Sequence, residues 1–129
     1  MKITFQEFNV FIPEWNRNKK QPESEQIKVH WRYPNSQEVK QIRYTTNPRM
    51  EMDPETKREI KNMYVEMKVD YHTAVEMLVD RIENLEVKGR LIETGKALVN
   101  TPGLNALFQE VSAEILFEMD KIKANSKNS

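Results

Sequence analysis

The clearest pattern in the chain is an alternation of apolar and basic residues between positions 27 and 33. Its apolar members are Ile27, Val29, Trp31 and Tyr33. A period of two predicts a β-strand with one buried face and one basic, solvated face. The β-branched and aromatic residues from Ile3 to Ile12 predict a second strand with a bulge, ended by Pro13. Residues 13–25 form a polar loop, and we expect the two strands to pair as an antiparallel hairpin that packs on helices or on another chain.

Helical signals follow the second strand. Asn35 and Glu38 have the spacing of a capping box, which predicts a short helix containing Val39 and Ile42. Residues 45–52 show no regular pattern and are expected to be irregular.

Residue 53 begins the strongest helix start in the chain. Asp53 is suited to the N-cap, Pro54 to the first helical position and Glu55 to the first turn. The apolar stripe that follows, at steps of one, three and four, consists of Ile60, Met63, Tyr64, Met67, Tyr71, Val75, Leu78, Ile82 and Leu85. This stripe fits one long helix, or two helices with Asp70 capping the second after a break near Val69. The break is favoured because an uninterrupted helix of nearly thirty residues is unusual in so small a domain.

The C-terminal part is also expected to be mostly helical. Gly89 is expected to end the preceding helix, and a short extended piece at Leu91 and Ile92 follows it. Thr94 is expected to cap a short helix, and Thr101 with Pro102 to start the last one. The apolar stripe of the last helix is Leu104, Leu107, Phe108, Val111, Ile115, Met119 and Ile122.

These elements predict an α+β fold, mostly helical, in which an N-terminal β-hairpin packs with a C-terminal helical bundle. Residues 1–50 would hold the hairpin and a short helix, and 53–122 the helical region, together forming one compact domain. The polar residues 123–129 are expected to form a disordered tail. The chain has 129 residues, which is one domain's worth.

Composition excludes several classes of function. The chain has no cysteine, so disulfide frameworks, Cys-ligated metals and thiol catalysis are ruled out. Twenty basic residues balance twenty acidic ones, which disfavours a nucleic-acid partner. The apolar runs are too short to span a membrane, and the N-terminus lacks a signal-peptide pattern, so a protein of the cell interior is expected.

Candidate chemistry is sparse. Gly89 and Gly95 are separated by five residues rather than the four of a phosphate loop, and Ala97 stands where that loop needs a hydroxyl. His30 and His72 lack neighbours with the spacing of metal ligands. We therefore expect no enzymatic activity and no cofactor or metal.

Partner contacts are the more plausible use of the surface. Trp15 with Arg17, Lys19 and Lys20 forms an aromatic and basic cluster in the first loop, of the kind that serves as a contact hot spot. An unengaged surface loop explains this cluster about as well. Met50 and Met52 lie outside the apolar stripe and are further candidates for a contact patch.

The second half of the chain resembles the C-terminal half of tail assembly chaperones of long-tailed bacteriophages. The segments that carry this resemblance are 80–89 (DRIENLEVKG), 92–99 (IETGKALV), 102–104 (PGL) and 107–111 (LFQEV). Weaker likeness is found at 11–16 (FIPEWN), 25–29 (EQIKV) and 126–129 (SKNS). By pattern the resemblance extends over about two thirds of the chain, and residues 45–68 match nothing in the family.

The resemblance implies a non-enzymatic helper in the host cytoplasm. Such a protein binds the tape-measure protein and helps recruit tail tube subunits before the tail polymerises. Partners would be those two proteins and further copies of the chain itself, without a membrane partner. A virion structural protein, such as a tail or head-completion component, is the alternative.

Overall fold

The computed structural model describes residues 1–2, 8–45, 50–52, 59–61 and 67–127. Within them the chain mixes helices with antiparallel strands, so the α+β class is confirmed. The strands are β1 (Asn9–Phe11), β2 (Lys28–Trp31), β3 (Arg43–Thr45), β4 (Met50–Met52), β5 (Glu59–Lys61), β6 (Met67–Val69), β7 (Val79–Glu83), β8 (Glu86–Val87) and β9 (Arg90–Leu91). The α-helices are α1 (Ser36–Ile42), α2 (Tyr71–Leu78), α3 (Gly95–Asn100) and α4 (Asn105–Lys127), and two 3₁₀ turns are η1 (Trp15–Lys20) and η2 (Glu23–Glu25).

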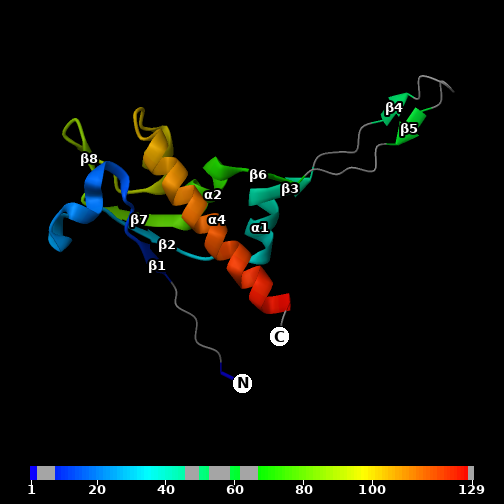
Figure 1. Ribbon diagram of the computed structural model, residues 1–129, viewed down its shortest axis with the longest axis horizontal. Coiled ribbons are helices and arrows are strands. Elements are labelled where there is room, and N and C mark those ends of the chain that lie inside the picture. Colours follow the sequence, from blue (N-terminus) through cyan, green and yellow to red (C-terminus); the bar gives the residue numbers. More distant parts are fainter. Residues whose placement is uncertain (3–7, 46–49, 53–58, 62–66, 128–129) are drawn as a thin grey trace.

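The central sheet has the order β1-β2-β7, and all its neighbours are antiparallel (Figure 1). The predicted pairing of the first two strands is therefore confirmed, with Phe11 opposite Val29 and Asn9 opposite Trp31. Val29 and Trp31 are buried, whereas Lys28 and His30 on the other face are only partly covered. The alternation of apolar and basic residues thus sets which face of β2 joins the core.

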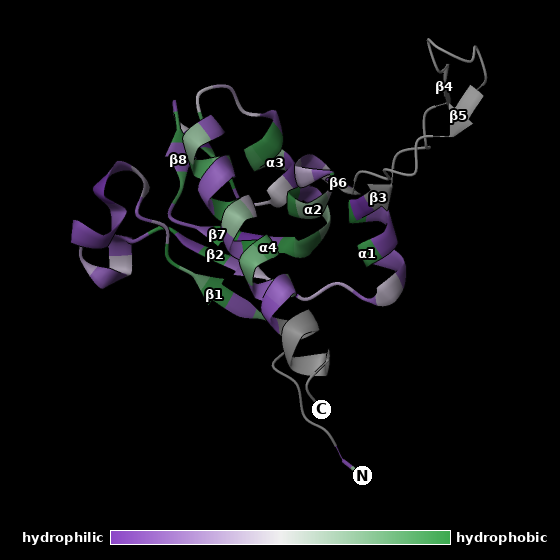
Figure 2. Ribbon diagram, turned by 45° about the vertical axis from the view of Figure 1, so that its right-hand side comes forward, coloured by the Kyte–Doolittle hydropathy of each residue, from purple (hydrophilic) through white to green (hydrophobic). Residues whose placement is uncertain are grey.

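One hydrophobic core unites the sheet with helices α2, α3 and α4. Figures 1 and 2 both show α4 running across the sheet. The apolar stripe of this helix is buried as predicted, from Leu107 through Val111 and Ile115 to Met119. Gly95 at the start of α3 lies so close to α2 that a Cβ atom would come within 2.2 Å of the Val75 carbonyl oxygen.

Three predicted helix starts are correct. Asn35 and Glu38 form a full capping box at the start of α1. The Asp70 side chain accepts a hydrogen bond from the Thr73 backbone N–H, and the Thr94 side chain accepts one from the Ala97 N–H. These bonds satisfy backbone donors that a helix start leaves free, which is why short polar residues predict such positions well.

The predicted helical region over 53–122 is wrong in its first part. Residues 59–61 and 67–69 form strands β5 and β6, while 53–58, including the expected Asp53 cap, lie outside the described residues. Strand β6 pairs with β3, so that Arg43 lies opposite Val69, and β4 pairs with β5. The expectation of irregular structure over 45–52 is likewise wrong for Thr45 and β4. Three-residue strands are too short to show an alternating pattern, so pairing with a distant segment overrides the apparent helical spacing.

The predicted helix also ends earlier than expected, because α2 stops at Leu78 and the chain continues as β7. The register between β2 and β7 shifts at His30 and Trp31: His30 lies opposite Arg81, and Trp31 opposite Val79. The extra residue, Asp80, makes a bulge. Because of the bulge, Val79 and Ile82 both face the core although they are three residues apart, a spacing that imitates a helix.

The remaining boundaries differ in smaller ways. Gly89 does not end a helix but lies with Lys88 in the turn between β8 and β9. Both residues have a positive φ, 52° for Lys88 and 79° for Gly89. Such a pair matches the two-residue turns that join hairpin strands. The last helix begins at Asn105 rather than at Thr101. Gly103 adopts a φ of 88°, outside the helical region, so the helix does not extend back to Thr101. It continues to Lys127, so most of the expected disordered tail over 123–129 is helical.

Candidate functional site

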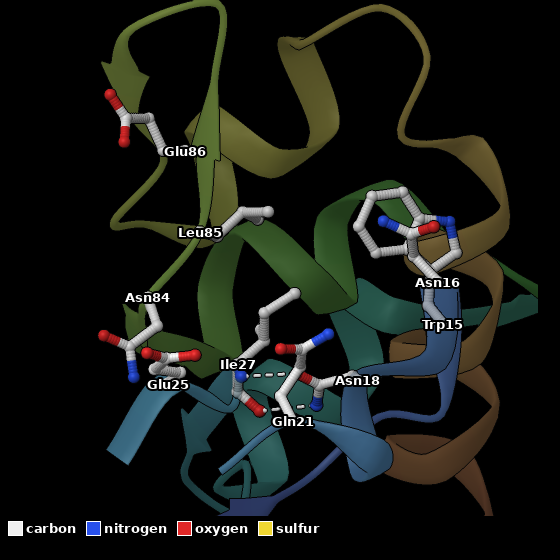
Figure 3. A pocket seen from close by; sticks show the side chains of 9 residues that line it. All are labelled: Trp15, Asn16, Asn18, Gln21, Glu25, Ile27, Asn84, Leu85 and Glu86. Atoms are coloured by element: carbon white, nitrogen blue, oxygen red, sulfur yellow. Dashed lines mark hydrogen bonds between the residues drawn. The ribbon is translucent and has the colours of Figure 1, made fainter. Parts of the chain in front are cut away.

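The loop over residues 13–27, which joins β1 to β2, is ordered by a buried amide. Asn18 is only 3% exposed. Its Nδ2 donates to the backbone oxygens of Pro13 and Ile27, at 2.8 Å and 3.1 Å, and its Oδ1 accepts from the Ile27 N–H at 2.6 Å (Figure 3). One side chain therefore ties the two ends of the loop together.

Other contacts brace the same loop from outside. The Glu14 backbone N–H donates to the Glu110 carboxylate of α4 at 2.7 Å. Asn84, just after β7, donates from Nδ2 to the backbone oxygens of Ser24 and Gln26, at 3.0 Å and 2.9 Å. The loop is thus attached to both the helix and the sheet.

Two residues within η1 have an uncommon backbone conformation. Asn16 and Arg17 have φ values of 53° and 59°, in the left-handed region. Asn tolerates this region, but for Arg it carries a steric cost because Cβ approaches the backbone. The bonds of Asn18 hold this turn in place, and residues held in strain are often found at binding sites.

A cavity of about 280 Å³ lies between this loop and the segment after β7. Figure 3 shows Trp15 on one side and Leu85 on the other, with Ile27 and Gln21 between them. Glu25 and Asn84 also line it. We call this cavity the Trp15 pocket.

The structure separates the six predicted partner-binding residues into two sets. Trp15 is half-buried, packs against the core and lines the Trp15 pocket. Arg17, Lys19 and Lys20 are exposed on η1, and the Lys19 ammonium lies 3.3 Å from the Glu14 carboxylate.

The two methionines form the second set. Met50 and Met52 lie in β4, opposite Lys61 and Glu59 of β5. Their side chains lie outside the described part of the chain, so the predicted contact patch at these two positions stays a prediction.

Neither histidine gathers metal ligands from the residues that the structure describes. His30 Nε2 lies 2.8 Å from the Glu83 carboxylate and 3.2 Å from the Arg81 guanidinium, and the hydrogen bond from His30 lowers the pKa of Glu83. His72 stacks on Phe108, with ring centroids 4.8 Å apart. Among the described side chains, no three His, Asp or Glu residues converge as a metal site would require.

The outer face of the central sheet is a second candidate surface. On β1, Val10 is 51% exposed and lies opposite His30, and Phe8 just before the strand is 39% exposed. Strand β1 has β2 as its only strand partner among the described strands, so it forms an edge of the sheet. An edge strand presents backbone groups that can pair with another chain.

Sequence reasoning missed Asn18, Asn84 and the Trp15 pocket itself. A single asparagine in a polar loop gives no pattern, because its importance depends on strands that are distant in sequence.

No helix within the described ranges is long and apolar enough to cross a membrane. Comparisons with protein-family models, curated protein sequences and solved structures find no match for this chain.

Proposed function

We propose that this protein is a non-enzymatic tail assembly chaperone of a long-tailed bacteriophage. It binds the tape-measure protein and assists assembly of the tail tube in the host cytoplasm. The sequence segments at 80–89, 92–99 and 107–111 support the assignment to phage tails. In this proposal the hairpin, extended by β7, packs with helices α2 to α4 as one binding body.

The observation that carries the polypeptide-binding role is the edge of the central sheet at β1, which no further strand of the described residues covers. Its exposed apolar residues are Phe8 and Val10, and the strand itself (Asn9–Phe11) bears no charge. Natural proteins usually protect such edges with charged residues, because uncharged edges pair with other chains. A client segment or a second copy of this chain can therefore add a strand there.

Self-association belongs to the same proposal. Sedimentation of the purified protein at micromolar concentration tests it. We expect a homo-oligomer, and a compact monomer at all concentrations contradicts this part of the proposal.

Co-expression with the tape-measure protein of the same genome tests the main proposal. We expect a soluble complex that elutes as one species on gel filtration. Val10→Lys introduces a charge at the edge and should weaken the complex at least tenfold. Leu91→Lys is the matched control, because Leu91 is also exposed, at 61%, but lies on β9. Loss of binding in both variants, or in neither, contradicts a role for the edge.

Mass spectrometry of purified virions separates the chaperone from the alternative function. A chaperone leaves before the particle is complete, so we expect none of its peptides in finished virions. A virion structural protein is present in them at a defined copy number. Finding this chain at such a copy number overturns the chaperone proposal.

A further inference from the structure

The Trp15 pocket has walls of two kinds. Trp15 provides an aromatic wall, and Ile27 and Leu85 provide an aliphatic one. Figure 3 shows the side chains of Ile27 and Leu85 directed into the space between them and Trp15. A polar head on an aliphatic stem fits such a space, because the stem can cover the apolar walls while the head reaches a polar partner beyond them.

The charged side chains of the pocket lining are both anionic. They are Glu25 and Glu86, and the described lining includes neither lysine nor arginine. An ionised carboxylate only accepts hydrogen bonds. Figure 3 shows the Glu86 carboxylate directed away from Trp15 and Ile27, so Glu25 is the carboxylate that can favour a ligand with hydrogen-bond donors. The exposed cations of η1, Arg17, Lys19 and Lys20, lie outside the lining.

The lining has four amides, of which Asn16 and Gln21 each carry a donor as well as an acceptor. Asn84 uses Nδ2 for the carbonyls of Ser24 and Gln26, which leaves its Oδ1, an acceptor, available. Asn18 uses both its amide nitrogen and its oxygen within the loop and so serves the wall rather than the ligand. Two of the amide groups are thus already committed as donors.

The pocket is held in shape before any ligand binds. The bonds of Asn18 and Asn84 close the loop, and the Glu110 carboxylate attaches it to α4 through Glu14. A site that is already ordered loses little conformational entropy on binding.

We propose that the Trp15 pocket binds the guanidinium of an arginine side chain from a partner polypeptide. The arginine stem crosses Trp15, Ile27 and Leu85, and its guanidinium reaches Glu25, which lies on the far side of Ile27 from Trp15 and accepts its hydrogen bonds (Figure 3). Arginine fits better than lysine, because its planar head spreads five donors over separated acceptors. The proposed function supplies the source of this arginine, since it makes the partner a client protein.

N-acetyl-L-arginine amide, titrated into the ¹⁵N-labelled full chain, tests the pocket by itself. We expect saturable shifts of the amide signals of Ile27, Asn84 and Leu85, with binding in the millimolar range. N-acetyl-L-citrulline amide is the matched control, because it has nearly the same shape without the charge. It should bind at least fivefold more weakly, and equal binding of the two compounds overturns the inference.

A pair of variants locates the site. Glu25→Gln removes the acceptor charge and should weaken binding of the arginine probe at least fivefold. Glu23→Gln removes an exposed charge on the same 3₁₀ turn, outside the lining, and should change binding less than twofold. The ¹⁵N spectrum shows whether each variant is folded. Equal effects of the two variants mean general charge attraction and overturn the inference.

The complex with the tape-measure protein separates this inference from the proposed function. Weakening of the complex by Glu25→Gln, but not by Glu23→Gln, supports both the arginine pocket and the chaperone role. A stable complex that Glu25→Gln leaves unchanged overturns the arginine pocket as a client site and leaves the chaperone role standing. Binding of the arginine probe without any complex supports the pocket and contradicts the chaperone role.

Discussion

The 13–27 loop and helix α4 are both attached to the central core, but by different means. Helix α4 is held by a series of buried apolar side chains, among them Leu107, Val111 and Ile115. The loop is mostly polar and depends on a few hydrogen bonds centred on Asn18. A distributed apolar contact weakens in steps when residues are changed, whereas a loop held by a few hydrogen bonds depends strongly on each residue that makes them. Substitutions in the two regions should therefore differ in the size and the reach of their effects.

Truncation of the α4 stripe should give the largest loss of stability. Leu107 and Ile115 are fully buried, so Leu107→Ala and Ile115→Ala each remove packed methyl groups and leave a cavity. We expect each variant to lose about 3 kcal/mol of unfolding free energy, measured by urea denaturation. Gln109→Ala, at an exposed position of the same helix, should stay within about 0.5 kcal/mol of the wild type. A comparable loss in Gln109→Ala contradicts the assigned orientation of α4.

Replacement of Asn18 should cost less in total and act locally. Asn18→Ala leaves the Pro13 and Ile27 carbonyls and the Ile27 N–H without their partner, at a cost of about 2 kcal/mol. Hydrogen exchange at Ile27 should become much faster in this variant, while exchange within α4 changes only as far as global stability falls. Asn18→Asp keeps an acceptor for the Ile27 N–H but places a carboxylate against two carbonyl oxygens, so it should be no better. A stable Asn18→Asp variant contradicts the assigned bonds.

Acid should act in opposite directions on two carboxylates, Glu38 of α1 and Glu114 of α4. The hydrogen bond from Arg32 lowers the pKa of Glu38 to about 2, helped by the Asn35 backbone N–H. Because the folded state holds this carboxylate ionised, the stability it provides is complete above its ordinary pKa of 4.5 and is lost as the pH falls towards 2. On α4, burial and then the neighbouring Glu118 raise the pKa of Glu114, so its ionised form opposes folding and acid relieves that penalty.

Two variants test whether each carboxylate stabilises or destabilises the folded state, by urea denaturation between pH 2 and pH 7. Glu38→Gln should lose about 1 kcal/mol at pH 7 and flatten the decline in stability between pH 4.5 and pH 2. Glu114→Gln should be slightly more stable than the wild type at pH 7 and lose this advantage in acid. Opposite signs at either position show that the stated contacts do not govern these carboxylates.

The same contrast explains how much of the fold could be predicted from the sequence. The α4 stripe and the alternation in β2 depend on many residues with one period, so both were predicted correctly. The caps at Asn35, Asp70 and Thr94 were predicted because they depend on bonds over three residues. Each of these signals is repeated or local.

The features that sequence reasoning missed depend on single residues and distant partners. The bulge at Asp80 gives Val79 and Ile82 a helical spacing, although they belong to a strand that pairs with β2, about fifty residues earlier. Asn18 likewise gains its role from Ile27 and Pro13, and nothing in its immediate sequence marks it. Of the residues that line the candidate site, the sequence singles out Trp15 as a candidate contact, but it does not indicate the pocket that Trp15 lines.

Relief of the strain in η1 should give the smallest effect. Arg17 has a φ of 59°, which glycine adopts without steric cost, so Arg17→Gly should gain about 0.5 kcal/mol of unfolding free energy. Lys20→Gly, at a position in the same turn without positive φ, should instead lose about 0.5 kcal/mol, because glycine is more flexible in the unfolded chain. Paired urea denaturation curves measure this difference. Since the described part of α4 contains no residue with positive φ, a gain at Arg17 but not at Lys20 would show that the polar loop, unlike the helix, holds its shape against backbone strain. Equal losses at both positions would mean that the bonds of Asn18 hold the loop without such strain.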